Sequence, residues 1–276
     1  MNINFTKMHG LGNDFVVINA ITQSVSLSSE KIRFIADRHF GVGCDQLLLV
    51  EKSDVADADF RYRIYNNDGG EVEHCGNGAR CFAIFVREEG LTTKSTIPVI
   101  TNNGLITLDI EDNGMVTVDM GAPILEPASI PFLAKEQSKS YALNIAGTDV
   151  NFGAVSVGNP HAVVVVDDVD SAPVEALGKA IQADKHFPNS VNVGFMQVID
   201  RNHIKLRVYE RGVGETQACG TGACAAVIVG RVQGLLDESV AANLLGGKLS
   251  ISWSGDKNPV MMTGPTATVF KGTITL

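Results

Sequence analysis

The chain has 276 residues, of which 45% are hydrophobic and 19% are charged. This composition is typical of a globular protein, and at roughly 150 residues per domain the length predicts about two domains. The net charge of −9 argues against partners such as nucleic acid or an anionic membrane, because both require a basic surface. No apolar run approaches the ~20 residues of a membrane span, and the first ten residues do not resemble a signal peptide. We therefore expect a cytoplasmic protein.

The predicted elements are mostly short strands with a few helices between them. Strands bounded by Gly, Asn or Asp are expected at residues 16–18, 46–50, 61–65, 107–110, 115–120, 163–166 and 205–209. The Asn113-Gly114 pair predicts a hairpin between two of these strands. Helices are expected at residues 30–39, 76–89, 174–183 and 220–233. The second and the fourth end at a glycine and are apolar nearly all round, which is typical of buried helices.

The sequence contains an internal repeat. Residues 63–79 (RIYNNDGGEVEHCGNGA) and 207–223 (RVYERGVGETQACGTGA) are identical at eight of seventeen positions without a gap. Residues 12–16 and 158–162 also align, with an offset of 146 instead of 144. The repeat predicts an α+β fold of two pseudo-symmetric duplicated domains, each a curved, mostly antiparallel sheet wrapped around a central apolar helix. We expect the active site in the cleft between the domains, which join near residues 121–131.

The five cysteines are an odd number, which argues against a secreted disulfide framework. We expect Cys44, Cys81 and Cys224 to be buried structural thiols. Cys75 and Cys219 each precede a predicted helix in a Cys-Gly-x-Gly-Ala motif. The first N–H groups of a helix bind anions such as carboxylates and lower the pKa of a nearby thiol.

Two such loops, one on each face of a Cα atom, suit the inversion of a stereocentre. One thiolate would remove the Cα proton, and the opposite thiol would deliver a proton to the other face. Zinc ligands or a redox pair are the alternatives, but the spacing contains no Cys-x-x-Cys. A purely structural role is disfavoured by the Gly-x-Gly after each cysteine. We expect no metal and no cofactor.

Six segments carry a resemblance to a known family. They are residues 8–19 (MHGLGNDFVVIN), 41–50 (GVGCDQLLLV), 63–81, 158–166 (GNPHAVVVV), 190–195 (SVNVGF) and 209–225. Through them the chain resembles the diaminopimelate epimerases, which are pyridoxal-phosphate-independent amino-acid epimerases. The resemblance implies interconversion of LL- and meso-2,6-diaminoheptanedioate in lysine and peptidoglycan-precursor synthesis. It also implies that a C-terminal strand returns to the first domain, which predicts domains of residues 1–119 with 265–276, and 120–264.

The resemblance also implies roles for individual residues. Cys75 and Cys219 would be the acid/base thiols, assisted by His161 and Glu210. The reacting carboxylate would be held by Gly76, Asn77, Gly220 and Thr221. Substrate recognition would fall to Asn13, Gln46, Asn66, Asn159, Asn192, Glu210 and Arg211. Members of the family often carry a dimer-contact tyrosine near the C-terminus, and Phe270 occupies that place here, so we expect a homodimer without the hydroxyl contact.

The chemistry of these residue types supports the assignment independently. Arg211 offers bidentate geometry to a second carboxylate, and Glu210 with the amide carbonyls can accept from an ammonium group. In the repeat, Glu210 and Arg211 align with two asparagines, and His161 aligns with Phe15. These breaks in symmetry would distinguish the reacting centre from the distal one. His9 and His74 adjoin the motifs and are left open between a site role and a structural one.

Two other functions stay open at this stage. A proline-type racemase or an isomerase related to phenazine biosynthesis would share the fold, but a proline-type racemase would have no use for Arg211 and Glu210 as a distal clamp. A non-catalytic amino-acid-binding protein would need the pocket but not the two thiols.

Overall fold

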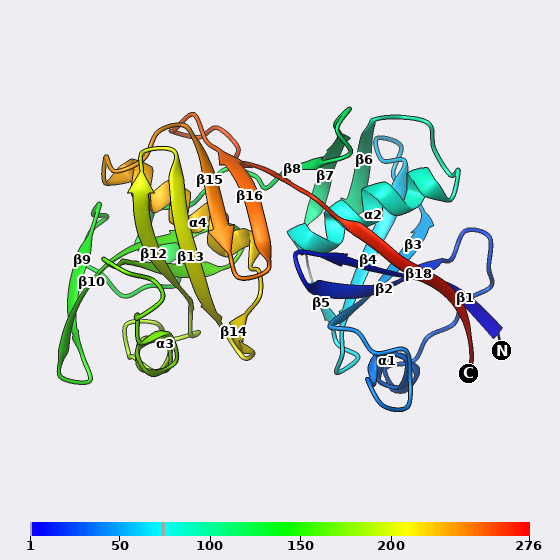
Figure 1. The fold of residues 1–276 in the computed structure, drawn as a ribbon, viewed down its shortest axis with the longest axis horizontal. Coiled ribbons are helices and arrows are strands. Elements are labelled where there is room, and N and C mark those ends of the chain that lie inside the picture. Colours follow the sequence, from blue (N-terminus) through cyan, green and yellow to red (C-terminus); the bar gives the residue numbers. More distant parts are fainter. Residues whose placement is uncertain (1, 73–74) are drawn as a thin grey trace. The chain divides into compact units, whose positions relative to one another are not determined.

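The computed structural model describes residues 2–72 and 75–276. The chain divides into two compact units, residues 1–119 with 263–276 and residues 120–262. The C-terminal strand therefore belongs to the first unit, where it runs beside the first strand of the chain (Figure 1). No helix among the described residues is long and apolar enough to cross a membrane.

The first unit is a sheet with two helices. Its elements are β1 (Asn2–Gly10), β2 (Asn13–Asn19), α1 (Ser29–Ala36), β3 (Gln46–Lys52), β4 (Phe60–Asn66), β5 (Glu71–Val72), α2 (Gly76–Glu88), β6 (Thr96–Thr101), β7 (Gly104–Ile110), β8 (Val116–Asp119) and β18 (Ala267–Thr275). The strands pair in the order β18-β1-β2-β3-β4-β6-β7-β8, with β5 also on β4. All pairs are antiparallel except β2 with β3 and β4 with β6.

The second unit repeats this arrangement. Its elements are η1 (Pro127–Ser129), β9 (Tyr141–Ile145), β10 (Thr148–Ser156), β11 (Pro160–Val165), α3 (Val174–Gln182), β12 (Asn192–Asp200), β13 (His203–Glu210), β14 (Gly214–Thr216), α4 (Gly220–Val232), β15 (Ser239–Leu244) and β16 (Gly247–Ser252). A further strand, β17 (Met261–Gly264), spans the boundary at residue 262. The pairing order is β9-β10-β11-β12-β13-β15-β16. The pairs β11 with β12 and β13 with β15 are parallel, and they correspond to β2 with β3 and β4 with β6 in the first unit.

The strand register confirms the internal repeat. Phe15 lies opposite Gln46 in the first unit, and His161 lies opposite Asn192 in the second, so both pairs keep the offset of 146. The next strands are shifted to an offset of 144, because the chain from Val193 to its partner Tyr209 is two residues shorter than the chain from Leu47 to its partner Tyr65. The predicted duplicated α+β fold is therefore confirmed.

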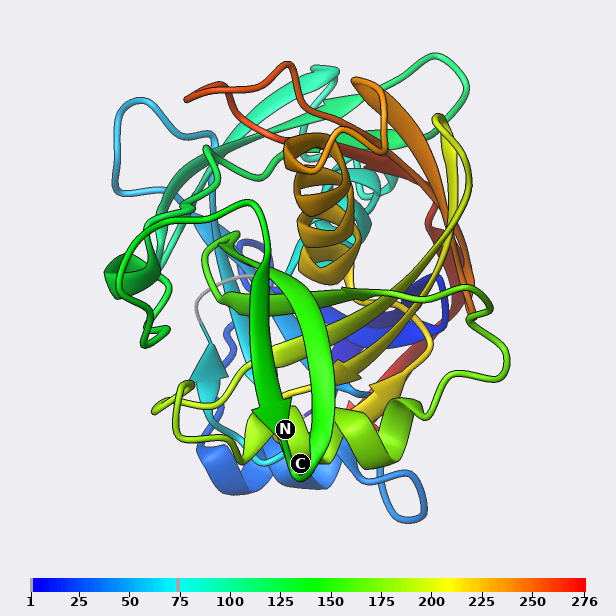
Figure 2. The ribbon, with the colours of Figure 1, turned by 90° about the vertical axis from the view of Figure 1, so that its left-hand side faces the viewer.

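A central helix organises each unit. Helix α2 packs against β1, β2, β3, β4, β7 and β8, and α4 packs against β10, β11, β12, β13, β15 and β16. Figure 2 shows α4 running through the middle of the second unit's strands. Both helices are followed by a glycine in the left-handed region, Gly90 (φ 67°) and Gly234 (φ 78°), as predicted from the sequence. The two helices are buried over most of their lengths, also as predicted.

One helix prediction is wrong at its C-terminal end. The segment expected to be helical to residue 39 ends at Ala36, with Asp37 in an extended conformation. The Asp37 carboxylate accepts hydrogen bonds from the N–H groups of His39 and Phe40, at 2.7 and 2.8 Å. A short acidic side chain that bonds to nearby N–H groups offers the backbone an alternative to the helix. The strands predicted from the sequence also omit β1, β5, β6, β9, β10, β12, β14, β15, β16 and β17.

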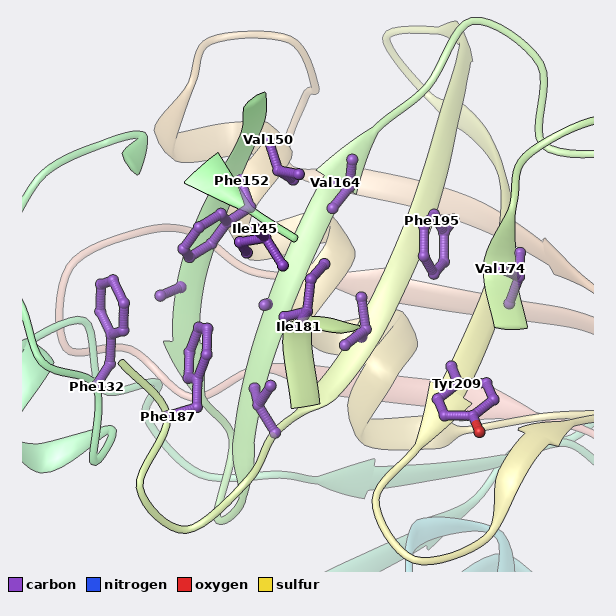
Figure 3. Packing of buried hydrophobic residues seen from close by; sticks show 14 of the residues in the cluster. Phe132, Ile145, Val150, Phe152, Val164, Val174, Ile181, Phe187, Phe195 and Tyr209 are labelled. Carbon is purple, nitrogen blue, oxygen red and sulfur yellow. The ribbon is translucent and has the colours of Figure 1, made fainter. Parts of the chain in front are cut away.

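Besides the packing around α4, the second unit has a hydrophobic core where α3 covers its sheet (Figure 3). The ring of Phe132 stacks on Phe187 with centroids 4.8 Å apart, and Phe152 contacts both. Gly178 of α3 lies so close to Tyr209 that an added Cβ would be 2.7 Å from the ring. This packing anchors the end of β13, immediately before Glu210.

Candidate active site

In the first unit, the expected polar residues gather at one edge of the sheet. Asn13 begins β2, Gln46 begins β3 and Asn66 ends β4. Because β2 and β3 are parallel and β4 runs against them, these three termini lie at the same edge. The Gln46 amide donates to Asn66 Oδ1 at 2.9 Å.

Cys75 lies at the same edge, as the residue that precedes α2. It is half-buried, and its Sγ donates to Asn13 Oδ1 at 3.7 Å. Its carbonyl oxygen accepts from the hydroxyl of buried Tyr62 at 3.3 Å. A Cβ at Gly78 would lie 2.5 Å from that hydroxyl. The second glycine of this motif therefore makes room for Tyr62, a reason that the sequence did not reveal.

In the second unit, Cys219 precedes α4 and is only 5% exposed. Its Sγ accepts from the N–H of Gly222 at 3.4 Å and lies 3.5 Å from the hydroxyl of Thr221. Burial nevertheless raises the pKa of this thiol well above its ordinary value, and the nearby Glu210 carboxylate raises it further. The Gly222 N–H at the helix N-terminus does lower the pKa, as expected, and so does the Thr221 hydroxyl, but desolvation and Glu210 outweigh these two donors and the net shift is upward.

Glu210 is a hydrogen-bonding neighbour of the Cys219 thiol. It is the last residue of β13, and its Oε1 accepts from the hydroxyl of Thr216 on the adjacent strand β14. A carboxylate in this position can take a proton from the thiol.

His161 is fully buried and lies beside three other predicted residues. Its Nε2 is 2.9 Å from Asn159 Oδ1, while its Nδ1 has no hydrogen-bond partner among the described residues. Burial, together with the positive charge of Arg211, lowers the pKa of His161 to about 3. The imidazole is therefore neutral at pH 7. Nearby, Asn192 Oδ1 accepts from the backbone N–H of Arg211 at 2.9 Å, which fixes the start of the turn after β13.

The guanidinium of Arg211 is exposed, and its Nη1 donates to the carbonyl oxygen of Asn189 at 2.9 Å. Within the described part of the chain it forms no ion pair with a carboxylate, so it is available to an anionic ligand.

Comparison with known proteins identifies the family. The family model for diaminopimelate epimerase matches residues 5–126 and 153–269. The chain belongs to the diaminopimelate epimerase family. A diaminopimelate epimerase of Thioalkalivibrio sulfidiphilus is 63% identical over 99% of both chains, and one of Teredinibacter turnerae is 59% identical over the full length of both. The resemblance carried by the six sequence segments is thereby confirmed.

Solved structures with the same fold are more distant in sequence. A phenazine biosynthesis protein of the PhzF family from Bacillus anthracis is 18% identical, with a TM-score of 0.72 over the whole of both chains. A hydroxyproline epimerase from Agrobacterium vitis is 15% identical, with a TM-score of 0.70 over 99% of this chain and 92% of its own. These likenesses show a shared fold.

For this member of the diaminopimelate epimerase family, the structure brings the expected site residues together within each unit. The first unit holds Asn13, Gln46, Asn66, Cys75, Gly76 and Asn77, and the second holds Asn159, His161, Asn192, Glu210, Arg211, Cys219, Gly220 and Thr221. Phe270 lies elsewhere, on β18, with its ring edge-on to Phe5 at 5.9 Å. His9 Nδ1 accepts from Gly12 N at 3.4 Å, and His74 lies outside the described residues.

Sequence reasoning missed four residues that support the first half of the site. They are Arg38, Asp45, Tyr62 and Arg80. Arg80 alone left a signal, since no other charged residue occurs before Arg87 in a helix that was expected to be buried. The three expected structural cysteines, Cys44, Cys81 and Cys224, are all buried, which confirms that expectation.

Proposed function

We propose that this protein is a diaminopimelate epimerase that interconverts LL- and meso-2,6-diaminoheptanedioate without a cofactor. One observation carries the proposal: each unit begins its central helix with a cysteine whose sulfur contacts another residue expected in the site. The full-length likeness to proteins named diaminopimelate epimerase supports the choice of substrate.

The reaction that we propose uses Cys75 and Cys219 on opposite faces of the substrate Cα. The thiolate of one removes the Cα proton, and the electron pair of the C–H bond moves into the carboxylate. The thiol of the other then protonates Cα from the opposite face, so one proton enters as one leaves. The N–H groups at the starts of α2 and α4, at Gly76, Asn77, Gly220 and Thr221, would stabilise the charge on the carboxylate.

Glu210 and His161 would assist in different ways. Glu210 adjoins Cys219, so it would accept the thiol proton when Cys219 acts as the base. His161, whose pKa is about 3, would act as a neutral hydrogen-bonding group that orients Asn159. At the distal centre, Arg211 would bind the carboxylate, and the amides of Gln46, Asn66 and Asn192 would complete recognition.

Proton NMR of LL-diaminopimelate in D2O, with the purified protein, tests the function directly. We expect the first turnover to place deuterium at one Cα of each molecule and to form the meso isomer. Exchange with proline, or formation of the DD isomer of diaminopimelate, would favour a different racemase of this fold. Binding without exchange would favour a non-catalytic binding protein.

The two cysteine variants test the mechanism. We expect Cys75→Ala and Cys219→Ala each to abolish epimerisation while circular dichroism shows that the fold persists. If either variant keeps a rate near that of the wild type, the two-base mechanism is wrong.

We further propose a cytoplasmic homodimer that uses the exposed side chains of β18. Val269 is 56% exposed and Phe270 is 47% exposed, so two consecutive large apolar residues of β18 are open to solvent. A reducing cytoplasm would keep the five cysteines as thiols. Light scattering should show a dimer that Phe270→Asp weakens. Leu105→Asp is the matched control, because Leu105 is similarly exposed (51%) on another strand.

A further inference from the structure

A continuous chain of hydrogen bonds runs through the first half of the site. The Arg80 guanidinium donates from Nη2 to Asn77 Oδ1 at 2.8 Å. Asn77 Nδ2 donates to Asn13 Oδ1 at 3.2 Å, and Asn13 Nδ2 donates to Asp45 Oδ2 at 3.0 Å. Arg38 Nη2 donates to the other oxygen of Asp45 at 2.7 Å. Between the charged side chains of Arg80 and Asp45, the chain therefore consists of two amides.

The two ends of this chain determine how both amides are oriented. A guanidinium can only donate hydrogen bonds, and an ionised carboxylate can only accept them. Asn77 must therefore turn its oxygen toward Arg80, and Asn13 must turn its nitrogen toward Asp45. As a result the oxygen of Asn13 points to the thiol of Cys75, which donates to it at 3.7 Å. A flipped amide would break two of these bonds.

The surrounding structure is built to keep these charged residues in place. Arg80 is fully buried, and an added Cβ at Gly10 would lie 3.1 Å from its Nη2. Asp45 also accepts from the backbone N–H of Asp14 at 3.1 Å, and Arg38 binds the Asp14 carboxylate through two nitrogens, at 2.8 and 3.0 Å. The carboxylate that faces Asn13 is thus held at both of its oxygens.

The second unit holds its equivalent asparagine in the opposite way. At the offset of 146, Asn159 corresponds to Asn13, and buried Val191 stands where the first unit has Asp45. The contact of Asn159 is through its oxygen, 2.9 Å from His161 Nε2, and its Nδ2 has no hydrogen bond within the described part of the chain. The two pseudo-equivalent amides are therefore anchored by opposite ends.

We propose that Asp45, with Arg80 at the far end of the chain, is a positioning residue that locks the Asn13 amide so that its oxygen faces Cys75 and the substrate. The first unit then presents a hydrogen-bond acceptor, which suits an ammonium group, and the second unit presents a donor, which suits a carboxylate. The anchors thereby convert two equivalent asparagines into opposite recognition elements. This assignment of substrate groups rests on the proposed function, whereas the lock itself does not.

A double-mutant cycle on kcat/KM for diaminopimelate tests the coupling. We expect Asp45→Asn to lower kcat/KM roughly tenfold to hundredfold, the range for a hydrogen bond to a charged group. In an Asn13→Ala background, the same substitution should cost less than about twofold, because no amide remains to be positioned. Asp59→Asn is the matched control: it removes the same charge from the same unit, where Asp59 pairs with Lys94, and its effect should multiply with that of Asn13→Ala.

Multiplicative losses for Asp45→Asn and Asn13→Ala would overturn the proposal, since a merely structural role predicts that result. If Asp45→Asn fails to fold, as judged by circular dichroism, the same cycle is run with Asp45→Ser. A protein that is inactive on diaminopimelate would refute the proposed function but not the lock, which a second measurement tests.

That measurement is NMR on the protein labelled with ¹⁵N-asparagine and needs no substrate. The side-chain amide of Asn13 is assigned by its loss in Asn13→Ala. Its protons should exchange with solvent at least about tenfold more slowly in the wild type and in Asp59→Asn than in Asp45→Asn, because exchange requires the bond to Asp45 to open. Equal exchange rates in the wild type and Asp45→Asn would show that Asp45 does not hold the amide.

Discussion

Replacing His161 by phenylalanine should make the second unit less sensitive to mild acid. The repeat itself suggests this substitution, because Phe15 occupies the equivalent register position opposite Gln46. His161 is fully buried, and its pKa is lowered to about 3 from an ordinary value of 6.5. As the pH falls below 6.5, the unfolded chain binds a proton at this residue and the folded chain does not. The wild type therefore loses stability between pH 6.5 and pH 3.

The size of the effect follows from the lowered pKa. At pH 5 the difference of about 1.5 pH units, at 1.36 kcal/mol per unit, corresponds to roughly 2 kcal/mol of lost unfolding free energy. In His161→Phe this loss should disappear, while the other histidines contribute equally to both proteins and cancel in the comparison.

Urea unfolding at pH 7, 6 and 5 measures the effect. The only tryptophan, Trp253, is buried in the same unit as His161, so its fluorescence reports on the relevant part of the protein. We expect the free-energy difference between the two proteins to change by about 2 kcal/mol from pH 7 to pH 5. Parallel pH dependences would refute the reasoning, since they would mean that His161 takes up its proton equally well in the folded state.

Three further predictions concern other parts of the chain. Cys81→Ser should lower the unfolding free energy by about 1–3 kcal/mol in a urea titration, because it buries a hydroxyl within α2, and kcat should stay unchanged. Gly222→Ala should lower kcat roughly tenfold or more, because its methyl group would lie 3.2 Å from the sulfur of Cys219; Gly194→Ala, whose methyl group meets its nearest neighbour at 3.5 Å, should keep near-normal kcat. Arg211→Met should lower kcat/KM for diaminopimelate roughly tenfold to hundredfold and leave turnover of lysine unchanged, and equal losses for both amino acids would exclude Arg211 as the ligand of the distal carboxylate.

Much of the fold is readable from local sequence. The repeat around Cys75 and Cys219 revealed the duplication, and the glycines after α2 and α4 marked where the central helices end. The position of a helix end depends on residues within one or two turns of each other, because local steric preferences determine it. The same locality explains the error at Asp37, where a side chain competes with the helix for its own neighbours' N–H groups.

The sequence also indicated which polar residues lie together within each unit, because the motifs place Asn13 and Cys75 in the first unit, and His161 and Cys219 in the second, at or near strand and helix ends. Only the tertiary structure decided how these groups behave. Burial and Glu210 raise the pKa of Cys219, and burial with Arg211 lowers that of His161. Asp45, thirty-two residues from Asn13 in sequence, sets the direction of its amide. Desolvation and hydrogen bonds between distant segments arise only when the chain packs, and no local pattern of residues encodes their strength.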